Sequence, residues 1–409
     1  MEQVHAVYER LRAGAERLRT SSARERIQRL DALYAELLRR REDLQAAVYA
    51  DFRKPAIEFD ITELYVIKAE IRTVKRRLAE WMRERPVAGS LATFGARTWV
   101  RPEPQGATLI LAPWNYPVQL ALRPLVSAIA AGCSAAIKPS ELTPRTAQVL
   151  AEIIEAACAP DEVVCLPGGV EVAQALLAQP WNHIYFTGSP AVGKLVMAAA
   201  AQIPCSVTLE LGGKSPVFVL PDARISEVAE TLAWAKTANA GQICVAPDYV
   251  LVHSSQRDAL VDAVAAAIAR LYPDGTQSPD YQNIVAPHHA TRLRSAIDEA
   301  VAGGARRAYT SPGGETGPCS VAPTVLTDLP PGCSLLEEEI FGPVLPVVTY
   351  TDLDEAVAFV RARPIPLALY IFGRSRRSIR SILSRVPSGN ASINAAVVHV
   401  SSTSLPFGG

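Results

Sequence analysis

Residues 107–138 read ATLILAPWNYPVQLALRPLVSAIAAGCSAAIK, and this stretch decides the fold. It begins with an apolar, β-rich run, continues with a helical pattern over 118–131 and ends with a second apolar run at 134–138. Two buried strands joined by a helix are typical of a parallel sheet whose faces are covered by helices. The stretch therefore predicts an α/β fold.

The same alternation continues along the chain. The patterns predict further helices at 144–158, 171–178 and 190–202, with strands at 162–166 and 182–187. A second alternating region predicts strands at 215–220 and 247–253, helices at 224–239 and 256–271, and less regular strands near 344–350 and 367–372. We therefore expect two α/β domains joined near Glu210.

The region before residue 107 has a different character. An amphipathic pattern over 23–50 predicts a helix broken once, and a second charged helix begins near residue 60 and ends where Pro86 and Gly89 interrupt it. Two β-rich runs surround PEPQG within residues 96–112. They predict a hairpin at that motif, which leads into the first buried strand.

Charge and hydropathy restrict the partners. The 409 residues include 41 basic and 41 acidic ones, so no net charge favours nucleic acid or an anionic membrane, and a small-molecule partner fits better. Residues 1–20 carry alternating charges, and no apolar run reaches the roughly 18 residues of a membrane span. We expect a cytoplasmic protein.

Cysteine and histidine spacing indicates no metal site. The seven cysteines are scattered without a C-x-x-C pair, and no histidine lies near one at metal-ligand spacing. His288 and His289 are expected at the start of a surface helix. We expect neither a bound metal nor a disulfide framework.

One glycine-containing turn could meet a phosphate. In HIYFTGSPAVGKL, residues 183–195, an apolar strand reaches Gly188 and a helix follows, so that backbone N–H groups at the helix start are available to an anion. Leu195 replaces the hydroxyl residue that a P-loop needs, and Pro190 replaces the central glycine of the usual dinucleotide motif. A strand-to-helix turn without a ligand remains the alternative.

Two residues suggest covalent chemistry. Cys244 in ANAGQICVAPDY follows a predicted helix and Gly241, so its thiol could be an accessible nucleophile, although a lone cysteine is more often a small buried hydrophobe. Glu210 in VTLELGGKSP lies inside an apolar strand, where a carboxylate is either paired with a cation or desolvated into a useful base. Lys236, before Cys244, could lower the pKa of the thiol if it pointed inward, but a solvated lysine is the commoner outcome.

Seven motifs occur together and in order along nearly the whole chain: PWNYP at 113–117, KPSE at 138–141, FTGSPAVG at 186–193, LELGGKSP at 209–216, GQICVAPDY at 241–249, EEIFGPVLP at 338–346 and LPFGG at 405–409. In this order they resemble the aldehyde dehydrogenase superfamily. GQICVAPDY and SLPFGG most resemble its class 3 branch, which is dimeric, uses NAD or NADP, and oxidises fatty or aromatic aldehydes.

The resemblance implies roles for three residues. Cys244 matches the nucleophile, Glu210 the general base, and Asn115 the side chain that forms an oxyanion hole with the Cys244 amide. Such a site would oxidise an aldehyde to an acid through a thiohemiacetal and a thioester, which water activated by Glu210 then hydrolyses. A coenzyme A-acylating dehydrogenase is the alternative enzyme, although a water-activating base argues against it.

The resemblance also implies an NAD site, with NADP as a possible second cofactor. Because a carboxylate accepts hydrogen bonds from a ribose 2′-hydroxyl and repels a 2′-phosphate, Glu141 favours NAD. Lys138 and Glu141 would hold the adenosine ribose, Ser189 and the helix after it the pyrophosphate, and Glu339 and Phe341 the nicotinamide end. The remaining residues expected along this path are Trp114, Phe186, Gly188 and Gly193.

The domain organisation follows from the same resemblance. It implies two Rossmann-like parallel-sheet domains, a cofactor domain of residues 1–85 and 106–210 and a catalytic domain of 211–395. Residues 86–105 and 396–409 would form a small β element for homodimerisation. Because the chain stops at Gly409, inside the family's PFGG-x-x-x-SG-x-G segment, we expect the last strand of that element to be missing, and a truncated, inactive cofactor-binding homologue remains an alternative.

Overall fold

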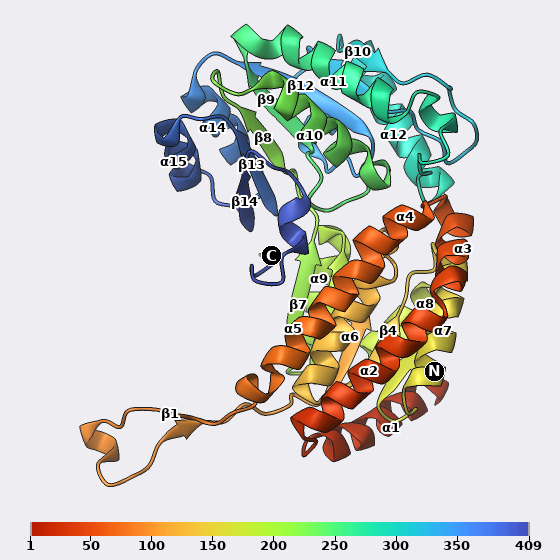
Figure 1. Ribbon diagram of the computed structural model, residues 1–409, viewed down its shortest axis with the longest axis vertical. Coiled ribbons are helices and arrows are strands. Elements are labelled where there is room, and N and C mark those ends of the chain that lie inside the picture. The colour runs from red at the N-terminus through yellow and green to blue at the C-terminus, as the bar shows by residue number, and fades with distance from the viewer. Residues whose placement is uncertain (1, 408–409) are drawn as a thin grey trace. The chain divides into compact units, whose positions relative to one another are not determined.

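The computed structural model describes residues 2–407, and their contacts form two compact α/β units (Figure 1). One unit comprises the chain up to Asp51 and Ala56–Glu210; the other comprises Phe52–Pro55 and the chain from Leu211 onward. We call them the five-strand unit and the seven-strand unit after their main sheets. The predicted α/β fold with two parallel-sheet domains is confirmed. Gly408 and Gly409, which complete the predicted LPFGG motif, lie outside the described residues.

The five-strand sheet has the order β5-β4-β3-β6-β7. Its central strands β3 and β4 are buried at every position, and β3 pairs in parallel with both β4 and β6. Parallel pairing brings the carboxyl ends of these strands to one edge of the sheet. The strands are β3 (Ala107–Leu111), β4 (Ser134–Lys138), β5 (Val163–Cys165), β6 (His183–Gly188) and β7 (Ser206–Leu211).

Helices connect and cover these strands. Ser22 begins α2 with a capping box, in which its hydroxyl accepts the Glu25 N–H and the Glu25 carboxylate accepts the Ser22 N–H. The predicted break in the first long helix is confirmed, since α2 ends at Arg39 and α3 starts at Arg41. The helices are α1 (Glu2–Leu18), α2 (Ala23–Arg39), α3 (Arg41–Phe52), α4 (Ala56–Phe59), a π-helical turn (Asp60–Leu64), α5 (Tyr65–Trp81), α6 (Gln119–Ala131), α7 (Pro144–Ala157), α8 (Val170–Leu177) and α9 (Pro190–Ala200).

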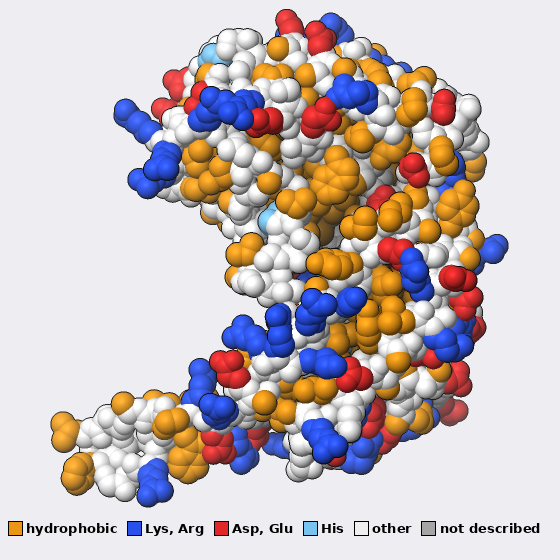
Figure 2. Space-filling view, in the orientation of Figure 1, with side chains coloured by type: hydrophobic (Ala, Val, Ile, Leu, Met, Phe, Trp, Pro, Cys, Tyr) orange, Lys and Arg blue, Asp and Glu red, His pale blue; other side chains and the backbone are white. Residues whose placement is uncertain are grey.

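A small antiparallel pair lies between α5 and β3. It joins β1 (Arg85–Pro86) to β2 (Trp99–Val100), and a 3₁₀ turn (Leu91–Thr93) lies between them. The hairpin predicted around PEPQG is wrong, because the strands on either side of that motif do not pair with each other: β2 pairs with β1, and β3 pairs with β4 and β6. Figure 2 shows hydrophobic side chains on the surface of this β1–β2 arm, where Leu91 and Phe94 are 96% and 92% exposed.

The seven-strand sheet has the order β10-β11-β12-β9-β8-β13-β14. Neighbouring strands in this sheet pair in parallel, except that β10 and β11 pair antiparallel. Side chains of β8, β9 and β13 pack with helices α14 and α15 in one apolar core cluster. The strands are β8 (Pro216–Val219), β9 (Tyr249–His253), β10 (Arg306–Thr310), β11 (Thr324–Thr327), β12 (Val344–Tyr350), β13 (Ala368–Phe372) and β14 (Asn390–Ile393).

The helices of this unit are α10 (Ile225–Thr237), α11 (Arg257–Leu271), α12 (Pro287–Ala302), α13 (Ser334–Glu337), α14 (Leu353–Arg361) and α15 (Arg376–Arg385), with short 3₁₀ turns at Ala238–Gly241 and Val398–Ser401. Helix α12 begins beside His288 and His289, as expected. Within residues 2–407, none of the helices combines the length and the apolar character that crossing a membrane requires.

Candidate active site

Cys244 follows a strained loop at the end of α10. Three consecutive residues there, Asn239, Ala240 and Gly241, have positive φ angles of 51°, 50° and 72°. Glycine is required at position 241 for a second reason, because a Cβ would lie 2.3 Å from the Gly342 carbonyl oxygen. This conformation costs free energy, so the surrounding contacts must hold it in place.

Those contacts come largely from Gln242. Its side-chain amide donates to Asn239 O at 2.9 Å and to Asn283 O at 3.1 Å, while its oxygen accepts the Val285 N–H at 3.0 Å. The Ala246 N–H then closes a turn onto Ile243 O at 2.9 Å. Cys244 is therefore the second residue of a closed turn, and it is half-buried rather than enclosed.

Four of the other cysteines are poorer nucleophiles than an accessible thiol would be. Cys133 and Cys333 are buried. Burial raises the pKa of Cys158 and of Cys165 to about 12, so both remain protonated at neutral pH. Neither Cys158 nor Cys165 is therefore a competing thiolate nucleophile.

Glu210 lies near the end of β7 with an unusual environment for a carboxylate. Its Oε2 atom is buried and has no hydrogen-bond partner among the described residues. Burial raises its pKa to about 7, although the positive charge of Arg123 opposes the shift. Of the two alternatives raised by the sequence, a desolvated base and a salt-bridged carboxylate, this environment favours the base.

Asn115 lies in the turn between β3 and α6. It is 3% exposed, whereas the neighbouring Trp114 is half-buried. The buried Glu63 carboxylate accepts the N–H groups of Val118 and Gln119 at 2.7 and 3.1 Å, and so fixes the start of α6. The side-chain amide of Asn115 is thus carried by a turn with a defined backbone.

The predicted phosphate turn joins β6 to α9. Ser189 is the N-cap of α9, and its hydroxyl accepts the Val192 N–H at 3.4 Å. A Cβ at Gly188 would lie 2.5 Å from the ring of Phe186, so glycine permits a close approach there. The buried Thr187 hydroxyl has no hydrogen-bond partner among the described residues, and the buried Gly193 lies in the first turn of the helix. A helix N-terminus with an unsatisfied hydroxyl beside it fits a phosphate.

Lys138 and Glu141 form an ion pair just beyond β4. The lysine side chain is 7% exposed, but the glutamate side chain is 43% exposed. Burial raises the pKa of Glu141, but the hydrogen bond from Lys138, a backbone hydrogen bond and the positive charge of Lys138 together outweigh this and leave the pKa below its ordinary value. The pair therefore presents an ionised carboxylate to solvent or to a ligand.

Glu339 and Phe341 follow α13 in the seven-strand unit. The Glu339 carboxyl group packs against Gly212, where a Cβ would lie 1.9 Å from Oε2. Burial, followed by the negative charge of Asp248, raises the pKa of Glu339 to about 8, against the opposing effects of the Gly213 N–H, Lys214 and Arg292. Glu339 is therefore mostly protonated at neutral pH. Phe341 has a positive φ of 49° and belongs to the segment next to Gly241.

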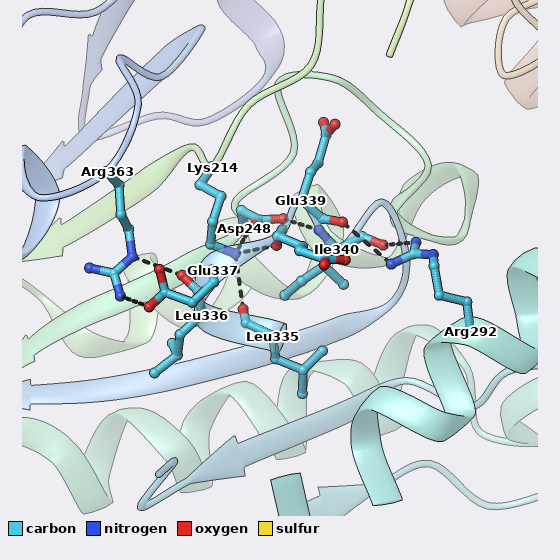
Figure 3. Close-up of polar contacts among 10 residues, drawn as sticks. Lys214, Asp248, Arg292, Leu335, Leu336, Glu337, Glu339, Ile340 and Arg363 are labelled. Carbon is cyan, nitrogen blue, oxygen red and sulfur yellow. Dashed lines mark hydrogen bonds and ion pairs between the residues drawn. The ribbon is translucent and has the colours of Figure 1, made fainter. Parts of the chain in front are cut away.

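A buried ion pair supports this segment, and the sequence did not predict it. The Lys214 ammonium pairs with Asp248 and also donates to Leu335 O at 2.9 Å and Glu338 O at 2.7 Å. The second oxygen of Asp248 accepts the Ile340 N–H at 3.0 Å. Figure 3 shows Asp248 and Leu335 beside Lys214, with the Glu339 side chain extending away from them. The pair holds the backbone on both sides of Glu339. In the sequence, Lys214 was visible only as part of the LELGGKSP motif.

Lys236 corrects an expectation. A solvated lysine was expected before Cys244, but Lys236 is 1% exposed and its ammonium nitrogen has no hydrogen-bond partner among the described residues. Burial lowers its pKa to about 8, while the negative charges of Asp248 and Glu339 act in the opposite direction to the burial. The helix α10 packs this side chain inward, which helical spacing alone did not reveal.

The predicted residues fall into two groups. Eight follow or end strands β3, β4 and β6, whose carboxyl ends share one edge of the five-strand sheet: Trp114, Asn115, Lys138, Glu141, Phe186, Gly188, Ser189 and Gly193. Cys244, Glu339 and Phe341 belong to the seven-strand unit, and Glu210 is the last residue of the five-strand unit. The carboxyl edge of an open parallel sheet is the usual ligand site of such folds.

Comparison with known proteins gives a consistent result. A sequence model of the "Aldehyde dehydrogenase family" matches residues 1–409. The chain is 39% identical over 410 residues to aldehyde dehydrogenase family 3 member A2 of Rattus norvegicus, a match that covers 100% of this chain and 82% of the relative.

Solved structures agree with the sequence relatives. A substrate-bound Staphylococcus aureus AldH is similar with a TM-score of 0.94 and 36% identity, covering 99% of this chain and 88% of that one. A Mycobacterium tuberculosis aldehyde dehydrogenase complexed with NAD+ is similar with a TM-score of 0.87 and 26% identity, covering 96% and 82%.

Proposed function

Because this chain belongs to the aldehyde dehydrogenase family, we propose that Cys244, Glu210 and Asn115 carry out its reaction. The chain is an NAD(P)-dependent aldehyde dehydrogenase and oxidises an aldehyde to a carboxylic acid. The observation that carries the residue assignment is the half-buried Cys244 in a turn closed by Ala246 and braced by Gln242.

The first half of the reaction forms a thioester. The Cys244 thiolate adds to the aldehyde carbon, and the negative charge moves to the former carbonyl oxygen. The Asn115 side-chain amide and the Cys244 backbone N–H donate to that oxygen, so they stabilise the charge where it develops. The nicotinamide ring supplies the electron acceptor for the oxidation. Oxidation of the thiohemiacetal leaves an acyl group bound to Sγ.

The second half hydrolyses that thioester. The Glu210 carboxylate takes a proton from water, the oxygen of which attacks the acyl carbon. The carbon–sulfur bond then breaks, the carboxylic acid leaves and the thiolate is restored. A carboxylate with a pKa of about 7 and an oxygen without a hydrogen-bond partner supports this role. The same base argues against transfer of the acyl group to coenzyme A.

The five-strand unit fits a dinucleotide. We assign the pyrophosphate to the Ser189 cap and the first turn of α9, supported by the unsatisfied Thr187 hydroxyl. We assign the adenosine ribose to Lys138 and the exposed Glu141 carboxylate, which favours NAD over NADP because it repels a 2′-phosphate. Glu339 and Phe341 would hold the nicotinamide end, and Trp114 and Phe186 would line the path between.

Apolar aldehydes are the proposed substrates. Trp234 on α10 is 41% exposed, and Val398 is 53% exposed. Val398 directly follows Val397, whose N–H donates to the Tyr370 hydroxyl. These exposed apolar side chains of the seven-strand unit support medium-chain aliphatic or aromatic aldehydes. A series of aldehydes of graded length tests this, since a KM that does not fall with length contradicts it.

Homodimerisation through the β1–β2 arm is also proposed. Its exposed Leu91, Phe94 and Trp99 form an apolar surface of the kind that marks an interface. Analytical ultracentrifugation measures the outcome, and a monomer at assay concentrations contradicts the proposal.

The experiment for the central assignment replaces Cys244. We expect Cys244→Ala to abolish aldehyde-dependent NAD reduction, because it removes the thiol that attacks the aldehyde carbon. Cys319→Ala, which removes another half-buried thiol of the same unit, is the control and should keep full turnover. Full turnover of Cys244→Ala excludes the assignment. Acyl-CoA formation on addition of coenzyme A would identify an acylating enzyme instead, and cofactor binding by the native chain without turnover would identify an inactive homologue.

A further inference from the structure

Tyr370 connects the Cys244 turn to a distant part of the chain. It lies on β13 with no exposed surface, and its hydroxyl donates to the Val245 carbonyl oxygen at 2.5 Å. Val245 directly follows Cys244 and occupies the third position of the turn that Ala246 closes. The hydroxyl therefore fixes the peptide plane that follows the nucleophile. Gln242 makes its hydrogen bonds before the nucleophile in the chain.

The same hydroxyl accepts a second hydrogen bond. The Val397 N–H donates to it at 3.3 Å, and Val397 has a positive φ of 66°. Such an angle is costly for a β-branched residue and persists only where neighbours enforce it. Asn394, at a φ of 55°, anchors the start of this segment through two hydrogen bonds with the Gly373 backbone, at 2.9 and 3.0 Å.

A third contact holds the ring of Tyr370. The ring of His399 lies edge-on against it at 5.8 Å, and His399 is itself held by a 2.5 Å hydrogen bond with Asn390 on β14. Because β14 pairs in parallel with β13, these residues form one connected support for segment 394–399. The Tyr370 hydroxyl links this support to the turn that carries Cys244.

We propose that Tyr370 is a positioning residue, whose hydroxyl holds the Val245 carbonyl and the Val397 amide together and thereby orients Cys244 for attack. The inference rests on the proposed role of Cys244 as the nucleophile. In this role Tyr370 acts on the direction of the Sγ atom through the backbone. It also makes the geometry of the nucleophile depend on the strained segment 394–398.

The chemistry of the hydroxyl suits a permanent link. Burial raises the pKa of Tyr370 well above its ordinary value, so the hydroxyl stays protonated and donates throughout the neutral range. Removing it leaves a carbonyl and an amide without their partner in a buried site, and buried groups tend to move toward other partners. The turn that carries Cys244 then loses its fixed orientation.

Tyr370→Phe in the full chain tests the proposal. We expect the rate of the first turnover, measured as the pre-steady-state burst of NADH, to fall about tenfold, while the KM for aldehyde and the affinity for NAD change less than about twofold. In the protein without cofactor, amide hydrogen exchange should increase over residues 242–247 and 394–399. That second measurement does not depend on turnover, so it separates a failure of this link from a failure of the Cys244 assignment.

Tyr350→Phe is the matched control. Tyr350 is also a buried tyrosine of the same sheet, and its hydroxyl donates to Val219 O at 3.0 Å, on a strand and not on the Cys244 turn. We expect a similar loss of melting temperature and an unchanged burst rate. A burst rate that is equal in the two variants overturns the proposal.

A second replacement covers the case in which Tyr370→Phe does not fold. Incorporation of 4-aminophenylalanine at position 370 keeps a donor to Val245 O while weakening the acceptor for Val397 N–H. A burst rate within about twofold of the native one supports the proposal. A tenfold loss in that folded variant overturns it, because the donor to the turn is still present.

Discussion

Each unit of the molecule contains a lysine–carboxylate pair next to a strand, and the two pairs differ in exposure. In the five-strand unit, Lys138 and Glu141 leave the carboxylate side chain 43% exposed. In the seven-strand unit, both side chains of Lys214 and Asp248 are 5% exposed. The ammonium of Lys214 and both oxygens of Asp248 also bind backbone groups or each other.

The difference in exposure separates a structural pair from a binding pair. We call Lys214–Asp248 the sealed pair and Lys138–Glu141 the open pair. Every polar atom of the sealed pair is hydrogen-bonded, so this pair can hold the backbone but has no free atom for a ligand. An open pair keeps an ionised carboxylate that can exchange water for a ligand hydroxyl. Glu210 is a third case, a carboxylate whose buried Oε2 has no hydrogen-bond partner among residues 2–407, and its pKa accordingly rises to about 7.

The largest expected effect comes from breaking the sealed pair. Lys214→Met should lower the free energy of unfolding by about 3–5 kcal/mol, because it leaves the Asp248 charge buried without its cation. Urea titration measures this. Lys138→Met makes the same change in the open pair and should cost about 1 kcal/mol or less, since water can solvate Glu141. Equal losses in the two variants would remove the distinction between the pairs.

The next effect concerns the unpaired carboxylate. Glu210→Gln should slow thioester hydrolysis by about 100-fold and allow an acyl-enzyme to accumulate, because the amide does not accept the proton from water. Rapid-quench mass spectrometry detects this species. Glu227→Gln changes an exposed carboxylate on α10 and should leave hydrolysis unaffected.

The pH dependence of thioester hydrolysis tests the same role of Glu210. Glu210 acts as a base only when ionised, so hydrolysis in the native chain should fall as the pH drops through about 7, by about tenfold per pH unit below it. A hydrolysis rate that stays constant from pH 8 to pH 5 would contradict the assignment, as would unchanged turnover of the glutamine variant.

The smallest effect concerns the open pair. Glu141→Gln removes the charge that repels a 2′-phosphate, so the ratio of kcat/KM for NADP to that for NAD should rise about tenfold. Fluorescence titration of the two cofactors should show the same trend in affinity. If the native chain already uses NADP as well as NAD, the carboxylate does not select the cofactor.

Local patterns in the sequence predicted many of the elements closely. The strands expected at 134–138 and 344–350 have those bounds in the structure, because a buried strand has a short apolar run that ends at polar or turn residues. The motifs around Cys244, Glu210 and Asn115 were also legible, since each combines a reactive side chain with nearby glycine or proline. By contrast, the hairpin around PEPQG was wrong, because the partner of Trp99–Val100 lies before the turn at Arg85–Pro86.

The sequence by itself indicated the family, the alternation of strands and helices that makes an α/β fold, and which residues have the chemistry for an aldehyde dehydrogenase. Only the tertiary structure decided that Lys236 is buried, that Lys214 pairs with Asp248, and that Tyr370 joins Val245 to Val397. The physical reason is that periodicity reports how a segment presents its faces, whereas burial of a charge or a hydroxyl is tolerated only where partners from distant segments converge. Those partners are 34 residues apart for the ion pair and 125 and 27 for the two tyrosine bonds.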